Sequence, residues 1–218
     1  MVIDPGPDVE NHVRALASRL SDAERVVIAL THGHGDHSDA APALAAATGA
    51  EVWGPAGIGH VDRVLQDGDV LETDEGDLVA IHTPGHTREH VCFHWPARRA
   101  LFVGDLVLGE GDTTWVAEYP GCVADYLDSL ARVRALDVDV LYPAHGPPLD
   151  DVRGTLERYE GHRRRRIEQV REGLAEQPDA DLDTLLDYVY GDTIPPKMRG
   201  AAKRSLEALV DFVRSTPD

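Results

Sequence analysis

The stretch that decides the fold reads Thr31-His32-Gly33-His34-Gly35-Asp36-His37 and directly follows the apolar residues 26–30. The apolar run predicts a buried strand, and the glycines predict a loop that can turn sharply between neighbouring side chains. Neutral imidazole and carboxylate are the ligands that zinc and similar divalent ions prefer. We therefore expect this loop to bind metal, rather than to be a surface loop that happens to be rich in histidine.

Three later segments have the same pattern, in which a short apolar stretch precedes a polar side chain and a glycine or proline turn. They carry His86, Asp105 and His145. Together with the four candidate ligands of the first loop, His32, His34, Asp36 and His37, these residues exceed what one tetrahedral ion needs. The economical arrangement is two ions that share a bridging carboxylate.

Helices and strands alternate around these motifs. Helical spacing of apolar residues covers residues 9–20 and 40–47, and a further amphipathic helix covers residues 123–133. Short strands are expected at residues 51–53, 69–72, 78–82, 90–95, 100–104 and 139–142. After residue 150 only helices are expected: a long arginine-rich one, one at 181–190 and one at 197–214. The pattern predicts an α/β catalytic domain over residues 1–150 and a helical tail over residues 151–218.

The composition restricts the partners of the chain. Its net charge of −18 comes from 39 acidic and 21 basic residues, so most of the surface repels polyanions and only a local basic groove could bind nucleic acid. No apolar run is long enough for a membrane helix, and the first residues lack the features of a signal peptide. We expect a cytoplasmic protein that does not enter a membrane, with Cys92 and Cys122 buried and not joined in a disulfide.

The motifs His-x-His-x-Asp-His, Thr-Pro-Gly-His-Thr, Gly-Asp and Ala-His-Gly, in this order, closely resemble the metallo-β-lactamase superfamily of metallohydrolases. The resemblance runs over residues 31–146 and implies a four-layer αββα sandwich. It also implies the ligands: His32, His34 and His86 for the first ion, Asp36, His37 and His145 for the second, and Asp105 as the bridge. Zinc is the expected metal, while manganese and iron accept the same ligands.

The resemblance also concerns the start of the chain. The family's Asp-Pro-Gly turn matches Asp4-Pro5-Gly6, which implies that Asp4 supports the metal loop. Family members normally have further strands before this turn. We therefore expect an exposed sheet edge here, and with it either a homodimer or a protein prone to aggregation.

A finer resemblance concerns the substrate. Residues 108–114 and the tail with His162 and Arg163 resemble the lactamase-like branch that includes single-strand endoribonucleases, whose members carry a winged-helix-like tail. An aspartate at position 105 resembles the thioesterase and ribonuclease branches more than true β-lactamases. The first hypothesis is a phosphodiesterase that cleaves single-stranded RNA, and the alternative, favoured by the acidic surface, is a thioester hydrolase resembling glyoxalase II. A β-lactamase and a non-catalytic interaction protein are less favoured.

Water is the expected nucleophile in each hydrolase, because the sequence has no Gly-x-Ser-x-Gly elbow and neither cysteine lies among the ligands. Asp36 or Asp105 would accept the proton of the bridging hydroxide during attack. His90 has two interpretations, as a residue that contacts substrate or ligands and as a structural histidine. The run of arginines at 163–166 spans a whole helical turn, so it is either a solvated helix surface or an RNA contact.

Overall fold

The computed structural model describes residues 1–191 and 194–216, and the chain forms two compact units. The first unit consists of Met1–Thr83, Glu89–Glu110 and Asp137–Val152 and contains every strand that the structure describes. The second consists of Pro84–Arg88, Gly111–Leu136 and Arg153–Asp218. Four positions of the predicted tail, residues 192–193 and 217–218, lie outside the described residues.

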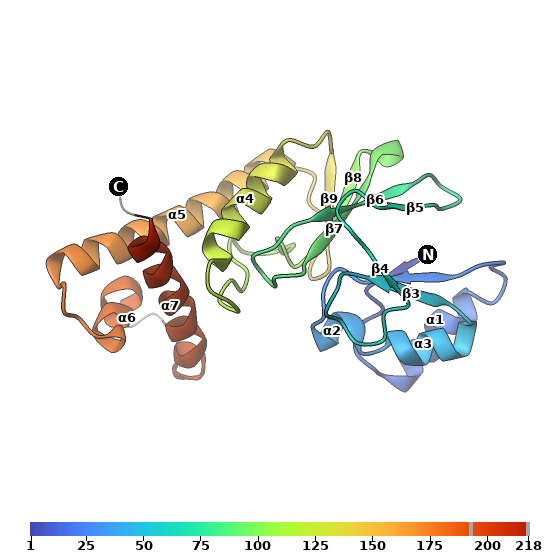
Figure 1. Ribbon diagram of the computed structural model, residues 1–218, viewed down its shortest axis with the longest axis horizontal. Helices are drawn as coiled ribbons and strands as arrows, with labels where there is room; N and C mark the ends of the chain where they lie inside the picture. Colours follow the sequence, from blue (N-terminus) through green and yellow to red (C-terminus); the bar gives the residue numbers. More distant parts are fainter. Residues whose placement is uncertain (192–193, 217–218) are drawn as a thin grey trace. The chain divides into compact units, whose positions relative to one another are not determined.

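The first unit contains a parallel sheet, sheet A, with the strand order β1-β2-β3-β4. The strands span Val2–Ile3, Val27–Ala29, Glu51–Gly54 and Arg63–Val64. All three residues of β2 are buried, as expected for a strand that is covered on both faces. Helices α1 (Glu10–Arg19) and α3 (Ala41–Thr48) cover one face, where Val13 and Leu44 pack with Ile28 of β2 (Figure 1).

The second sheet of this unit, sheet B, has the strand order β5-β6-β7-β8-β9. Its strands span Val70–Leu71, Leu78–His82, Val91–Trp95, Ala100–Gly104 and Val140–Pro143, and a short 3-10 helix, η1 (Pro96–Arg98), connects β7 to β8. Neighbouring strands are antiparallel except β8 and β9, which are parallel. Ala29 of β2 packs with Ala80 and Phe93 in one buried cluster, so the two sheets face each other. The predicted α/β class with two stacked sheets is confirmed.

Most predicted elements lie close to their expected positions, but three elements were not predicted: β1, α2 and β4. Residues 35–38 form a short helix, α2 (Gly35–Ser38), where the sequence predicted only loop. This helix forms because the His34 carbonyl oxygen accepts hydrogen bonds from the amides of His37 and Ser38. Strand β4 was not predicted because it has only two residues, and both are exposed.

Helices make up most of the second unit. They are α4 (Cys122–Arg134), α5 (Val152–Glu176), α6 (Leu182–Tyr190) and α7 (Arg199–Ser215), with a 3-10 turn, η3 (Pro196–Met198), before α7. The Asp181 side chain begins α6 by accepting a hydrogen bond from the Thr184 amide. The described residues from 153 onward contain no strand, and the resemblance of this tail to a winged helix stays a prediction. Among the described helices, none has both the length and the apolar content needed to cross a membrane.

The chain after β8 and the chain after β9 pass each other at very short range. The Gly109 amide donates to the His145 carbonyl oxygen at 2.7 Å, and the Ala144 amide donates to the Gly104 carbonyl oxygen at 3.0 Å. A Cβ atom placed on Gly109 would lie 2.5 Å from backbone atoms of Gly146 and Pro147. Only glycine fits at position 109, and the contact holds together the two segments that carry Asp105 and His145.

Gly109→Ala should lower the free energy of unfolding by about 1–3 kcal/mol, because the atoms that its Cβ would meet are backbone and cannot rotate away. Urea denaturation measures this loss. Gly200→Ala on α7 is the matched control, since nothing lies within 4 Å of its added Cβ. Its stability should be unchanged or slightly higher, because alanine favours helix more than glycine does. Equal stability of the two variants would contradict the tight contact at Gly109.

Candidate metal centre

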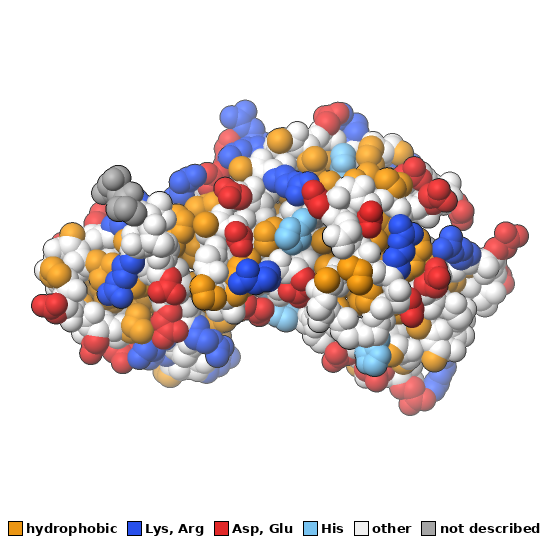
Figure 2. Space-filling view, in the orientation of Figure 1, with side chains coloured by type: hydrophobic (Ala, Val, Ile, Leu, Met, Phe, Trp, Pro, Cys, Tyr) orange, Lys and Arg blue, Asp and Glu red, His pale blue; other side chains and the backbone are white. Residues whose placement is uncertain are grey.

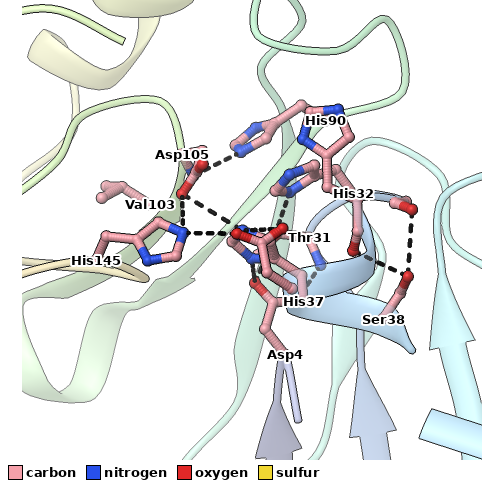
Figure 3. Close-up of polar contacts among 12 residues, drawn as sticks. Asp4, Thr31, His32, His37, Ser38, His90, Val103, Asp105 and His145 are labelled. Carbon is pink, nitrogen blue, oxygen red and sulfur yellow. Dashed lines mark hydrogen bonds and ion pairs between the residues drawn. The ribbon is translucent and has the colours of Figure 1, made fainter. Parts of the chain in front are cut away.

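The loop after β2 and the short helix α2 carry most of the predicted ligands (Figure 3). His32 and His37 are buried, whereas Asp36 is exposed. The ring centroids of His32 and His37 lie 4.1 Å apart, and those of His32 and His34 lie 4.7 Å apart. The loop and the helix together therefore place three imidazole rings close to one another.

Four side chains of the first unit point their donor atoms toward one point. The His37 Nε2 atom lies 3.6 Å from Asp105 Oδ1 and 3.7 Å from Asp36 Oδ1. The His145 Nε2 atom lies 3.2 Å from Asp36 Oδ2 and 3.6 Å from Asp105 Oδ1. The structure thus brings together all three ligands predicted for the second ion and the predicted bridge.

These separations fit a divalent metal ion. A tetrahedral ion with ligands at 2.0–2.2 Å holds its donor atoms roughly 3.3–3.6 Å from one another. Most of the observed distances are longer than a good hydrogen bond. The His37 Nε2 atom is buried and has no hydrogen-bond partner. Imidazole nitrogens and carboxylate oxygens at this spacing are suited to hold one ion among Asp36, His37, Asp105 and His145.

Asp4 fixes the orientation of two of the histidines. One of its carboxylate oxygens accepts the Thr31 amide at 2.8 Å, and the other accepts the Thr31 hydroxyl at 2.6 Å and His37 Nδ1 at 3.0 Å. Because the Thr31 hydroxyl donates its hydrogen to Asp4, its contact with His32 Nδ1 at 2.9 Å must be donated by the ring. Both rings therefore carry a proton on Nδ1, and Nε2 is the nitrogen that would bind a metal ion.

The turn that contains Asp4 is itself held against the metal loop. Asp4 has a left-handed backbone conformation with φ 46°, and its amide donates to the Ala29 carbonyl oxygen at 2.9 Å. The Gly6 amide donates to the His37 carbonyl oxygen at 3.1 Å, and the Gly6 carbonyl oxygen accepts the Ala40 amide at 2.9 Å. The Asp-Pro-Gly turn is thus hydrogen-bonded to the C-terminal end of α2 and to the chain just after it, and Asp4 contacts the loop that carries the predicted ligands, as the sequence analysis expects.

His86, the remaining predicted ligand, belongs to the second unit. Its Nδ1 atom donates to the Trp115 carbonyl oxygen at 2.8 Å, which leaves Nε2 as the nitrogen for a metal. His32 and His34 belong to the first unit, so the ion that these three residues are predicted to share stays a prediction.

Sequence reasoning missed two residues beside the centre. A cleft of about 430 Å³ is lined by Asp36, His37 and His145, and also by His12 and Tyr142. Tyr142 stacks on Phe102 with ring centroids 5.2 Å apart, and His12 Nε2 contacts the Pro5 carbonyl oxygen at 2.8 Å. Neither residue belongs to a ligand motif, and only the packing of the first unit brings them to the cleft.

The charge of the metal-free centre depends on His37. Burial opposes the protonation of this ring, but the carboxylates of Asp105 and Asp4 outweigh burial and raise the pKa of His37 to about 10. The charged ring therefore stabilises the metal-free fold fully below pH about 6.5, and this contribution is lost as the pH rises through about 10. An ion that binds Nε2 must displace this proton.

Metal uptake at pH 8 should therefore release a proton from His37, and the metal affinity should rise about tenfold per pH unit from this step alone. Isothermal titration calorimetry in buffers of different ionisation enthalpy counts the protons. Asp4→Asn should lower the pKa of His37 and reduce the number released at pH 8. The same proton count in the variant and in the wild type would contradict the assignment of this proton to His37.

Comparisons with known proteins identify the family of this chain. The family described as the metallo-beta-lactamase superfamily matches residues 1–145. The lactamase-like protein aptB of Emericella nidulans is 34% identical over 180 residues, which cover 78% of this chain and 55% of that protein. The atrochrysone carboxyl ACP thioesterase AgnL7 of Paecilomyces divaricatus is 31% identical over 196 residues, which cover 84% of this chain and 59% of that protein.

The chain thus spans little more than half the length of these two relatives. A crystal structure of a beta-lactamase domain protein from Burkholderia ambifaria has the same fold, with a TM-score of 0.85 at 20% identity. That match covers 98% of this chain and 76% of the other. With the family match, the two relatives and the donor geometry in agreement, we conclude that the chain belongs to the metallo-beta-lactamase superfamily.

Proposed function

We propose that this chain is a hydrolase with two divalent ions and that its substrates are thioesters. The main observation in favour of a hydrolase is that four side chains converge beside an open cleft: Asp36, His37, Asp105 and His145. Zinc is the proposed metal, because imidazole and carboxylate at tetrahedral spacing suit it.

Divalent ions held by these residues would lower the pKa of water toward neutral pH and would polarise the scissile carbonyl group. The protein's own part divides between two carboxylates. The Asp36 side chain is 56% exposed at the cleft, so it is the better placed to accept a proton and pass it to solvent. The Asp105 side chain is only 11% exposed, which suits a group that holds its position between two ions.

The contacts of the arginine run favour a small neutral substrate over RNA. Arg163 is buried and donates to the Thr114 carbonyl oxygen, and Arg166 donates to the Val189 carbonyl oxygen. Arg164 pairs with Glu160, and Arg165 lies 3.9 Å from Asp112. Each arginine thus has a partner inside the second unit.

Further along the tail, basic side chains are again matched by acids. Lys203 pairs with Asp183, and Arg199 pairs with Asp187. Figure 2 shows basic and acidic side chains interspersed over α5, α6 and α7, without one continuous basic surface on this face. A polyanion gains little from such a surface, whereas an uncharged thioester is not repelled by it.

A relative's name supports the same choice, since AgnL7 is described as an ACP thioesterase. Cleavage of single-stranded RNA stays a prediction that rests on the resemblance of residues 108–114 and of the tail. Cytoplasmic location and a homodimer likewise stay predictions.

The purified protein should contain close to two transition-metal ions per chain, because the predicted ligands define two adjacent sites. Asp105→Ala should lower this content and abolish turnover, since it removes the carboxylate shared by both sites. Inductively coupled plasma mass spectrometry measures the metals. Asp74→Ala, an exposed aspartate outside the centre, is the control and should keep wild-type metal content. Wild-type turnover in Asp105→Ala would show that the bridge is wrongly assigned.

The substrate class can be tested with three probes: an acyl N-acetylcysteamine thioester, an unstructured RNA oligonucleotide and a β-lactam. We expect turnover of the thioester with little dependence on salt, because no phosphate contact is made. Arg165→Gln and Lys203→Gln should leave this activity unchanged. Cleavage of RNA that weakens in these variants, with a salt slope of roughly −0.7 per phosphate contact, would instead establish the RNA hypothesis.

A further inference from the structure

His90 lies outside the ligand set, yet it is fully buried next to it. It directly precedes β7, and its ring centroid lies 5.3 Å from that of His32. The Val91 amide donates to the Thr31 carbonyl oxygen at 2.9 Å, so the backbone beside His90 is fastened to the metal loop. Figure 3 shows the ring beside both His32 and Asp105.

Two contacts determine which ring nitrogen of His90 carries the proton. The Asp105 amide lies 3.2 Å from Nε2, and an amide N–H can only donate, so Nε2 must accept. The proton of the neutral ring is therefore on Nδ1, which donates to the Thr83 hydroxyl oxygen at 2.9 Å. The opposite tautomer would place two N–H donors against each other.

A buried polar chain holds the ring in this state. The Thr83 hydroxyl accepts from His90, so its own hydrogen points to Cys92 Sγ at 3.2 Å or to the Ile81 carbonyl oxygen at 3.5 Å. Cys92 Sγ in turn lies 3.7 Å from the Val103 carbonyl oxygen. The contacts therefore run from Val103 of β8 through Cys92, Thr83 and His90 to Asp105, two residues after Val103.

The backbone at Gly104 makes this approach possible. Gly104 has a left-handed conformation with φ 49°, and an added Cβ would lie 2.7 Å from His90 Nε2 and 2.8 Å from Thr31 Oγ1. Any side chain at position 104 would push the ring away from the Asp105 amide. The glycine before the bridging aspartate therefore has a specific role, which is to let His90 reach the backbone.

We propose that His90 is a positioning residue, which accepts the Asp105 amide and thereby sets where the bridging carboxylate lies. The proposal rests on the dinuclear centre of the proposed function. The Asp105 carboxylate oxygen lies 3.6 Å from both His37 Nε2 and His145 Nε2, and rotation of the preceding peptide would change both distances. Residues that orient a ligand in this way typically contribute 10–100-fold in metal affinity.

The first test uses the metal-free protein and needs no substrate. Nitrogen-15 NMR of the histidine rings should show His90 with a protonated Nδ1 and a bare Nε2. A proton on Nε2 would overturn the proposal, because the ring could then not accept the Asp105 amide. Thr83→Val removes the hydroxyl that accepts from His90 Nδ1 and should disturb this tautomer. Faster exchange of the Asp105 amide with deuterium in this variant would support the proposal. Unchanged exchange of that amide would count against it.

The second test measures the metal pair itself by titration with cobalt(II). His90→Phe should weaken binding of the pair about 10–100-fold and change its absorption spectrum, because the Asp105 amide loses its acceptor. His90→Gln should restore part of both, since its carboxamide oxygen can accept the amide. His94→Phe, in the strand β7 that follows His90, is the matched control and should bind cobalt as the wild type does.

Two results would overturn the proposal. One is a wild-type cobalt spectrum and affinity in His90→Phe with only a loss of thermal stability, which would make His90 a packing residue. The other is an equal loss in His90→Gln and His90→Phe, which would show that the hydrogen bond does not matter. Thioester turnover is not used in either test. If the protein binds two cobalt ions but cleaves no thioester, the proposed substrate is wrong. The role of His90 is then still decided by the NMR and cobalt results.

Discussion

The arrangement of the candidate metal centre in the first unit depends on the hydrogen bonds that the Asp4 carboxylate accepts. It accepts from the backbone and the hydroxyl of Thr31 and from the ring of His37, and through Thr31 it also fixes the proton on His32. A carboxylate is the group suited to this place, because it can accept several hydrogen bonds at once and donates none. The positive-φ backbone of Asp4 shows that the turn holds it in an uncommon conformation in order to reach the loop.

The centre is assembled from backbone contacts as much as from side chains. The Asp-Pro-Gly turn is hydrogen-bonded to α2, and the first residue of β7 is hydrogen-bonded to Thr31. The end of β8 and the chain after it are hydrogen-bonded to Ala144 and His145. Side-chain ligands can only meet an ion when the segments that carry them are fixed first. Glycine occurs where two such segments approach most closely, at positions 104 and 109, because a Cβ atom would separate them.

Sequence patterns predicted the strands well where apolar residues form an unbroken run. Strands β6 and β8 lie at the predicted residues, and the core between the sheets follows from them. Helix α2 was not predicted, because the glycines of this segment indicate a loop; its single turn is closed by bonds to the His34 carbonyl oxygen, and the distant Gly6 also bonds to its C-terminal end. The four side chains that converge in the first unit could be singled out because they belong to short sequence motifs, and their role as metal ligands stays a prediction. The role of His90 was left open, since it depends on a backbone amide and on the absence of a side chain at Gly104.

The second unit is assembled from three separate stretches of the chain, of which the C-terminal tail is only one. The Ser129 hydroxyl of α4 donates to the Pro84 carbonyl oxygen, and Gly85 passes so close to Tyr126 that a Cβ atom would lie 2.6 Å from that residue's backbone. Arg163 of α5 holds Thr114 in turn. Such a unit cannot be exchanged between proteins as a contiguous cassette. A segment taken from the start of α5 onward would carry these helices without the stretches Pro84–Arg88 and Gly111–Leu136, which complete the unit.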